Sequence, residues 1–313
     1  MSVSKTQSSI GKRWLSIVAI SLVFFGAYFV LRALPDAQCG FLHYDEIVNA
    51  NGEVELCATN HAGFLDLSRL KYPVQATLET AEPLRPGEMA DVSLTLKTRG
   101  GMTIAPHELA VTHTKKMHVM LIDPSLEDYH HLHPQPDGID GRYLFDFEPK
   151  RPGNYQVFTE IVPARSRRQA IAVSELEVPG EPGELRFDRS VKSVVGGLHF
   201  ELESIPETLR TGRDYRFELY VNDASGAPAP LEMVMGAKGH MVAFDAARKG
   251  FAHMHPIDTI ASARTAGLSL GDDRGESLDF MFNVPNPGWY RLFAQIQIDG
   301  EAVFGRFDLK VEE

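Results

Sequence analysis

Histidines stand in closely spaced pairs at two places in this 313-residue chain. His253 and His255 lie one residue apart in FAHMHP, and His131 and His133 do so in YHHLHP. Because residues i and i+2 of a β-strand point to the same face, each pair would present two imidazoles side by side. Neutral imidazoles are typical ligands of copper and zinc, whereas Ca²⁺ and Mg²⁺ demand oxygen.

Each pair belongs to a longer pattern that is written twice. His118–Pro134 aligns with His240–Pro256 without a gap, and the apolar residues between the matches differ freely. Persistence of ligand-type residues while their apolar neighbours change favours a chemical role, because a core tolerates hydrophobic exchange. The identical pairs are His118/His240, Asp123/Asp245, His131/His253, His133/His255 and Pro134/Pro256.

The spacing lets a strand, a loop and a return strand bring three imidazoles together in each half. We therefore expect one metal site from His118, His131 and His133, and a second from His240, His253 and His255. Asp123 and Asp245 follow the first strand, where an aspartate can ligate the metal, orient a histidine or cap the turn. The alternative for both sets is a hydrogen-bonded polar edge without metal.

Copper is favoured over zinc by one further aligned pair. His113 stands opposite Met235, five residues before the shared histidine of each half. Both side chains bind copper, and a thioether favours the cuprous ion. Simple core filling is the other interpretation of the methionine. His107, His130 and His199 have no counterpart and are interpreted as ordinary histidines.

The framework around these residues is typical of an all-β protein. Alternating runs such as VQATLET and YRFELYVND are separated by Pro, Gly, Asp and Asn turns, and a second aligned segment pairs Phe145–Phe158 with Phe280–Phe293. We predict two tandem immunoglobulin-like β-sandwich domains, residues 73–178 and 185–313, joined by a Pro- and Gly-rich linker at 179–184.

The N-terminus carries the one long apolar run of the chain, from Trp14 to Leu34. It is long enough to span a membrane, and the preceding basic residues predict a cytoplasmic segment 1–13, a transmembrane anchor 14–34 and a neck 35–72. A cleaved signal peptide is the alternative. Either way the remainder lies outside the cytoplasm, and we predict a single-pass inner-membrane protein with periplasmic domains.

The neck holds the two cysteines of the chain, Cys39 and Cys57. In an oxidising compartment such a pair is expected to form a disulfide. Each cysteine also has a histidine four residues on, His43 and His61, so a Cys2His2 metal site is an alternative.

Charge and motifs limit the other functions. The formal net charge is −11 although residues 1–34 carry only basic charges, so the acidic body argues against nucleic acid as a partner. G-x-S-x-G, H-E-x-x-H and P-loop motifs are absent from the sequence, and no general base accompanies the histidines in both halves. We therefore predict a protein that is not an enzyme.

The stretch GAKGHMVAFDAARKGFAHMHP (Gly236–Pro256), set among these strands, resembles the small exported β-sandwich modules of the YtkA-like and FixH-like type. More loosely it resembles periplasmic copper-binding proteins of the CopC type. The resemblance covers residues 185–313 and, through the repeat, 73–178. It implies a link to copper or heavy-metal handling, with His240, His253, His255 and their repeat partners as the site residues.

Two departures from those families qualify this expectation. A CopC-type site begins at a mature N-terminal histidine, whereas this chain is tied to an anchor there. The first half reads THTKKMH where the second reads MGAKGH, so a degenerate first site is an alternative.

The sequence thus predicts metal storage, tolerance or delivery through histidine clusters that bind copper or zinc. The expected partners are the membrane, through residues 14–34, and metal-handling or oxidase-assembly proteins. The alternative is an assembly module of a membrane complex whose histidines are structural.

Overall fold

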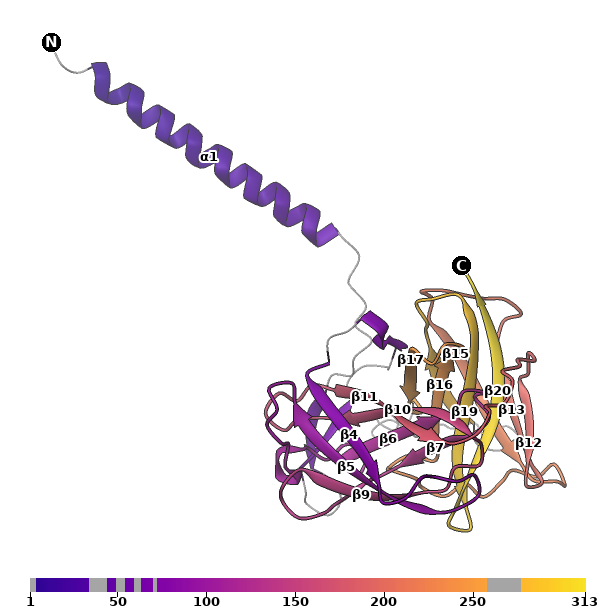
Figure 1. Ribbon diagram of the computed structural model, residues 1–313. Helices are drawn as coiled ribbons and strands as arrows, with labels where there is room; N and C mark the ends of the chain where they lie inside the picture. The colour runs from indigo at the N-terminus through magenta and orange to yellow at the C-terminus, as the bar shows by residue number, and fades with distance from the viewer. Residues whose placement is uncertain (1–3, 34–43, 49–53, 59–62, 70–71, 258–276) are drawn as a thin grey trace. The chain divides into compact units, whose positions relative to one another are not determined.

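The computed structural model describes residues 4–33, 44–48, 54–58, 63–69, 72–257 and 277–313. The chain divides into two compact units, Met1–Cys39 and Gly40–Glu313. The first is the helix α1 (Ser4–Ala33), and its segment Trp14–Ala33 is long and apolar enough to cross a membrane (Figure 1). Its apolar side chains are exposed on every face, as in a helix suited to lipid. Such a helix could be a membrane anchor or a signal sequence.

The first module of the second unit is a sandwich of two antiparallel sheets. One sheet has the strand order β4-β5-β9-β8 and the other β11-β10-β6-β7. Strict alternation of buried and exposed residues along β9 shows why RYLFDF forms such a strand, since one face packs on the core. The strands are β4 (Val74–Thr80), β5 (Ala90–Thr98), β6 (Met117–Ile122), β7 (Tyr129–Leu132), β8 (Gln135–Pro136), β9 (Arg142–Phe147), β10 (Gly153–Ile161) and β11 (Ala170–Val178), with a 3-10 turn η2 (Pro106–Glu108).

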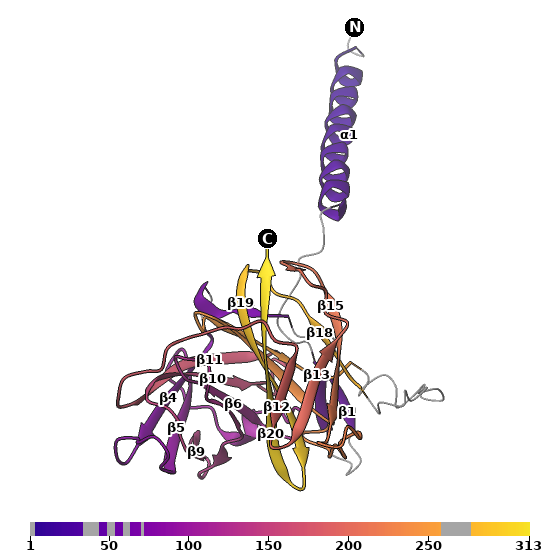
Figure 2. The ribbon, with the colours of Figure 1, turned by 90° about the vertical axis from the view of Figure 1, so that its right-hand side faces the viewer.

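The second module repeats this plan with extra strands. Its sheets have the orders β12-β13-β15-β18 and β14-β20-β19-β16-β17-β3. The strands are β12 (Lys192–Val195), β13 (Leu198–Glu203), β14 (Leu209–Arg210), β15 (Tyr215–Asn222), β16 (His240–Asp245), β17 (Gly250–Met254), β18 (Leu278–Phe282), β19 (Gly288–Ile298) and β20 (Glu301–Glu312). The prediction of two tandem immunoglobulin-like sandwiches after an apolar helix is confirmed (Figure 2).

The outermost strand of the second module comes from the predicted neck. β3 (Leu65–Asp66), followed by the 3-10 turn η1 (Leu67–Arg69), pairs antiparallel with β17. A β-carbon on Gly250 would lie 1.8 Å from the Leu65 carbonyl oxygen, so this close pairing requires glycine. Part of the neck is therefore built into the sandwich that lies later in the sequence.

The rest of the neck is described only in part. β1 (Tyr44–Val48) and β2 (Val54–Ala58) form an antiparallel hairpin. Cys57 lies in β2, but its side chain is not described. Cys39, His43 and His61 fall outside the described residues. The predicted disulfide and its metal-binding alternative therefore lie outside the described part of the chain.

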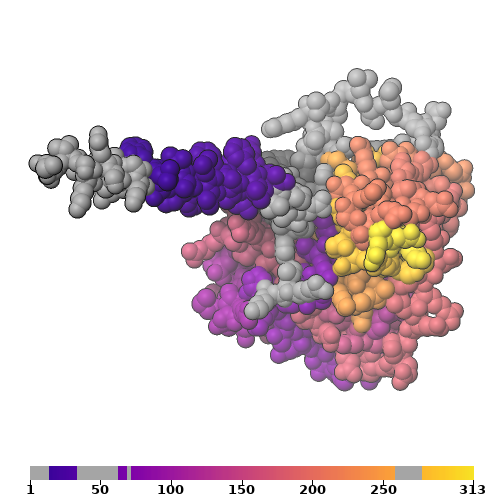
Figure 3. All heavy atoms as spheres, turned by 90° about the horizontal axis from the view of Figure 1, so that it is seen from above, coloured from indigo at the N-terminus to yellow at the C-terminus, as the bar shows by residue number. Residues whose placement is uncertain are grey.

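An apolar core joins the two modules. Tyr129 stacks on Phe293 with ring centroids 4.9 Å apart, and Phe158 meets Phe251 at 5.0 Å. The two contacts are equivalent with the modules interchanged, because the repeat aligns Tyr129 with Phe251 and Phe158 with Phe293. Buried residues from β6, β10 and β11 pack there against β16, β17 and β19. The surfaces of the two modules meet side by side in Figure 3.

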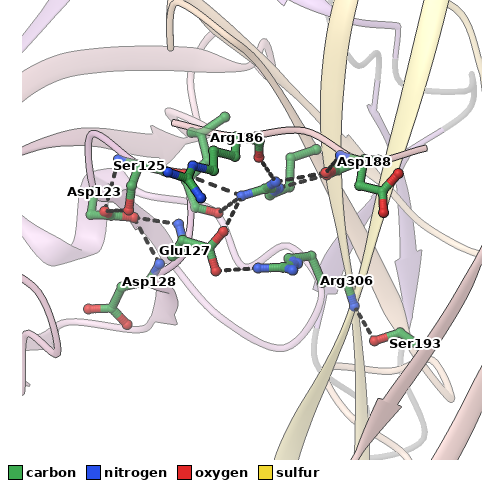
Figure 4. Close-up of polar contacts among 11 residues, drawn as sticks. Asp123, Ser125, Glu127, Asp128, Arg186, Asp188, Ser193 and Arg306 are labelled. Atoms are coloured by element: carbon green, nitrogen blue, oxygen red, sulfur yellow. Dashed lines mark hydrogen bonds and ion pairs between the residues drawn. The ribbon is translucent and has the colours of Figure 1, made fainter. Parts of the chain in front are cut away.

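A polar network borders this core. Arg291 is 1% exposed and donates to both carboxylate oxygens of Asp308, at 2.6 and 2.7 Å, and to Glu127 of the first module at 2.8 Å. Figure 4 shows Glu127, in the loop after β6, together with Arg306, which also donates to it. Charged groups buried this deeply are stable only when paired, so the network fixes how the modules dock.

Candidate metal centre

Seven histidines gather where β6 and β7 of the first module meet β16 and β17 of the second. Neighbouring imidazoles in this cluster have ring centroids between 3.8 and 6.4 Å apart. Strand alternation positions them: Leu132 and Met254, which separate the paired histidines, pack toward the cores of their own modules. The seven are His113, His118, His131, His133, His240, His253 and His255.

Three of them form what we call the first histidine group: His118, His131 and His133. One ring nitrogen of each lies within 4.8 Å of the others. Metal–nitrogen bonds are about 2.0–2.1 Å long, so nitrogens at these separations can share one ion after small side-chain movements. The structure thus brings together the three residues that the sequence assigns to the first module.

Hydrogen bonds fix the tautomers in this group. His118 Nε2 lies 3.1 Å from the Thr112 carbonyl oxygen, which only accepts, so Nε2 carries the proton. His131 Nδ1 likewise donates to Gln295 Oε1 at 3.0 Å. In the neutral rings, the lone pairs of His118 Nδ1 and His131 Nε2 then face each other at 3.2 Å. Two facing lone pairs repel each other, and a cation between or beside them would remove that repulsion.

A proton is poorly suited to be that cation. Burial, followed by repulsion from neighbouring histidines, lowers the pKa of His118 to about 4 and that of His131 well below its usual value. The same causes lower the pKa of His133 to about 3. The rings are therefore neutral at physiological pH, which is the form that binds a metal ion.

The second histidine group differs from the expectation. His240 and His255 share a site with His113 of the first module, their ring nitrogens lying within 4.8 Å of one another. His113 stacks on His255 with centroids 3.8 Å apart. The expected third member, His253, lies close by but directs one nitrogen elsewhere. The second group is thus assembled from both modules, which the separate-triad hypothesis did not include.

A tight turn carries His113 across the interface. Thr112 and Lys115 exchange backbone hydrogen bonds of 2.8 and 3.0 Å, and His113 and Thr114 between them have φ of 51° and 65°. Positive φ at both central residues is the mark of a type I′ turn, which projects its side chains away from the hairpin.

His253 is oriented by a buried carboxylate. Its Nδ1 donates to Glu160 Oε2 at 3.1 Å, and Gln169 Nε2 donates to the other carboxylate oxygen at 2.6 Å. Burial opposes the charge of Glu160, but these hydrogen bonds and nearby histidines lower its pKa to about 2. The arrangement directs His253 Nε2 between the two groups, and the ring centroid of His253 lies 5.1 Å from that of His131 and 4.7 Å from that of His255.

Most nitrogens of the cluster that face its interior have no hydrogen-bond partner in the described structure. Buried polar atoms without partners are rare and destabilising, so a group of them indicates a ligand. Burial also lowers the pKa of His113, to about 3, and the pKa values of His240 and His255, well below normal. The unpaired atoms are Nε2 of His113, His133, His253 and His255, and both ring nitrogens of His240.

The two aspartates of the repeat lie at turns instead. Asp123 accepts from the backbone of Ser125, Glu127 and Asp128 at 2.9, 2.7 and 2.8 Å. Asp245 accepts equivalent bonds from backbone NH groups after β16, at 2.7–3.3 Å. Neither aspartate belongs to a histidine group. The sequence left metal ligation, orientation of a histidine and turn capping open for them, and both cap turns.

The modules exchange equivalent contacts across the centre. His131 of the first module donates to Gln295 of the second, and His253 of the second donates to Glu160 of the first. The repeat aligns His131 with His253, and Glu160 with Gln295 two residues beyond the Phe158/Phe293 match. Reciprocal contacts of this kind define a pseudo-two-fold interface. Glu160 and Gln295 are not among the residues predicted from the sequence, and their aligned position was the signal that could have found them.

Comparisons with known proteins place the chain in a family without an assigned activity. A family model described as "Domain of unknown function (DUF8832)" matches residues 71–177 and 192–313. The chain belongs to this family. The matched segments correspond to the two sandwiches. No curated protein matches the chain.

Three solved structures are distantly similar to this chain. Trypsin-activated α2-macroglobulin from Escherichia coli has 12% identity and a TM-score of 0.25, with 86% of this chain and 18% of that one covered. Fibronectin(III)-like modules of Clostridium thermocellum CbhA have 10% identity and a TM-score of 0.21, covering 75% and 94%. The bacterial integrin-binding protein invasin has 10% identity and a TM-score of 0.22, covering 74% and 39%. This chain spans less than a fifth of the macroglobulin, and scores this low carry no functional argument.

Proposed function

We propose that this protein binds copper, or another soft transition metal, through the histidine cluster between its two modules. The observation that carries the proposal is the set of buried, unpaired imidazole nitrogens converging in two groups. Hydrogen bonds to Thr112, Gln295 and Glu160 hold three of the rings in fixed orientations. A structural polar edge would instead direct those free nitrogens to backbone carbonyls.

The donor set selects the class of metal. Imidazole nitrogens suit copper, zinc, iron and nickel, whereas the oxygen-rich shells of Ca²⁺ and Mg²⁺ have no counterpart here. Glu160, the buried carboxylate of the centre, already accepts hydrogen bonds from His253 and Gln169. It therefore orients a ligand and is not available as a general base, which supports a binding role over hydrolysis.

We further propose a membrane-anchored protein whose modules work in the periplasm in metal storage, tolerance or delivery. The apolar segment Trp14–Ala33 and the basic residues before it support the anchor. The resemblance of Gly236–Pro256 to exported metal-handling modules supports the compartment. Metal-handling or oxidase-assembly proteins are the proposed partners, and the acidic net charge of −11 argues against nucleic acid.

Metal titration of the full chain in detergent micelles tests the function. Wild-type protein should bind Cu(I) or Cu(II) at micromolar concentrations or more tightly, and His133→Gln and His255→Gln should each remove about one equivalent. His107→Gln changes an exposed histidine outside the cluster and should bind as wild type does. Wild-type protein that binds no copper or zinc, or variants that lose none, would leave the histidines with a structural role.

A further inference from the structure

The two modules carry the same turn at the edge of the centre. Val234 and Ala237 exchange backbone hydrogen bonds of 2.7 and 3.1 Å, as Thr112 and Lys115 do in the first module. The central residues Met235 and Gly236 have φ of 51° and 80°, so this is again a type I′ turn. Met235 has the φ of its aligned partner His113, 51° in both.

The turns also lie together. A β-carbon on Gly236 would be 4.0 Å from Thr114 Cγ2, so the tip of one turn is in van der Waals reach of the other. Met235 is only 8% exposed, whereas Met233 two residues earlier is 58% exposed. The position of Met235 is therefore covered, as a side chain directed into the interface would be.

Three kinds of contact define the pseudo-two-fold relation of the modules: two exchanged histidine hydrogen bonds, two exchanged aromatic pairs and the meeting of the two turns. The relation that exchanges His118 with His240 and His133 with His255 also exchanges His113 with Met235. His113 is placed by its turn on the second group, against His255. Applied to Met235, the same relation predicts a position beside the first group, next to His133.

We infer that the Met235 thioether is a ligand of the first histidine group, supplied across the interface as His113 is supplied to the second. This rests on the proposed function and refines it. The first group then offers imidazoles and one thioether, a soft set that favours Cu(I), while the second offers imidazoles alone, which suit Cu(II) or Zn²⁺. The two aligned sites thus differ in metal preference through one exchanged residue.

Competition titrations of the full-length protein in detergent test this assignment. Cu(I) is measured against a chromophoric chelator under reducing conditions, and Zn²⁺ is measured separately. Met235→Leu, which keeps the side-chain volume but removes the sulfur, should lower the affinity for one Cu(I) ion at least about tenfold. Even residues that only hydrogen-bond to a metal ligand typically contribute that much to metal affinity. The Zn²⁺ affinity of Met235→Leu should stay unchanged. Met233→Leu is the matched control, because that side chain is exposed.

Other outcomes have defined meanings. A Met235→Leu protein that binds Cu(I) as wild type does, or loses both metals equally, overturns the ligand role of Met235. Wild-type protein that binds Zn²⁺ or Cu(II) but no Cu(I) overturns the inference alone, whereas wild-type protein that binds neither copper nor zinc refutes the proposed function itself. If Met235→Leu fails to fold by circular dichroism, Met235→His decides: an imidazole there should raise the Zn²⁺ affinity of the first group, and unchanged Zn²⁺ affinity overturns the inference.

Discussion

Replacement of Arg291 by methionine should destabilise the docked modules strongly. The guanidinium is 1% exposed, donates to Asp308 at 2.6 and 2.7 Å, and reaches Glu127 of the first module at 2.8 Å. Methionine fills similar volume but leaves the Asp308 carboxylate, 5% exposed, buried without its cation. Removing one partner of a buried ion pair costs about 3–5 kcal/mol, so we expect a loss of this size in the free energy of unfolding.

Arg306→Met provides the matched control. Arg306 contacts the same Glu127 but is 44% exposed, and exposed pairs contribute about 0–1 kcal/mol. Urea unfolding of both variants, followed by tryptophan fluorescence and circular dichroism, measures the difference. Asp308→Asn in the Arg291→Met background should recover part of the loss because it removes the unpaired charge. Equal destabilisation by Arg291→Met and Arg306→Met would refute the reasoning from burial.

Three further changes test other parts of the structure. His113→Gln should remove about one bound copper per chain although His113 lies outside the second module, while His107→Gln should remove none. If both variants bind the same number of copper ions per chain, His113 is not a ligand. Gly250→Ala places a β-carbon 1.8 Å from a carbonyl oxygen of β3, so it should detach β3, seen as faster proteolysis near residue 64; an unchanged digestion pattern would contradict this. Burial raises the pKa of Asp128, but hydrogen bonds from His130, Tyr155 and the backbone lower it by more, so the net pKa lies below the normal value. The charged carboxylate thus stabilises the fold above its unfolded pKa of about 3.9. The loss of unfolding free energy caused by Asp128→Asn should shrink as pH falls from about 3.9 through the lowered folded pKa, and a loss that grows toward acid would contradict this prediction.

The repeat made most of the fold predictable. Alternating runs such as Arg142–Phe147 bury every second side chain, so strands and sandwich class follow from local pattern. The repeat also identified six histidines that the structure places in one cluster. Metal binding by that cluster stays a prediction.

The pairing between modules could not be read from the sequence. Which triad His113 joins depends on how two sandwiches dock, and docking is set by side chains far apart in the chain, such as Tyr129 with Phe293 and Arg291 with Glu127. The aspartates illustrate a different limit. A carboxylate after a strand has the same sequence signature whether it ligates a metal or accepts backbone hydrogen bonds, and only geometry distinguishes the two.

The origin of β3 has a practical consequence for dissecting this protein. Because residues that precede the first sandwich close the sheet of the second, cutting the chain at the 179–184 linker does not yield two intact halves. A fragment that starts at residue 185 leaves the β17 edge without its neighbour, and an open edge strand invites pairing with other chains. Aggregation of such a fragment would then report the missing edge rather than an unstable domain. A covalent connection between residues 64–69 and 185–313 is the design that keeps this sheet whole.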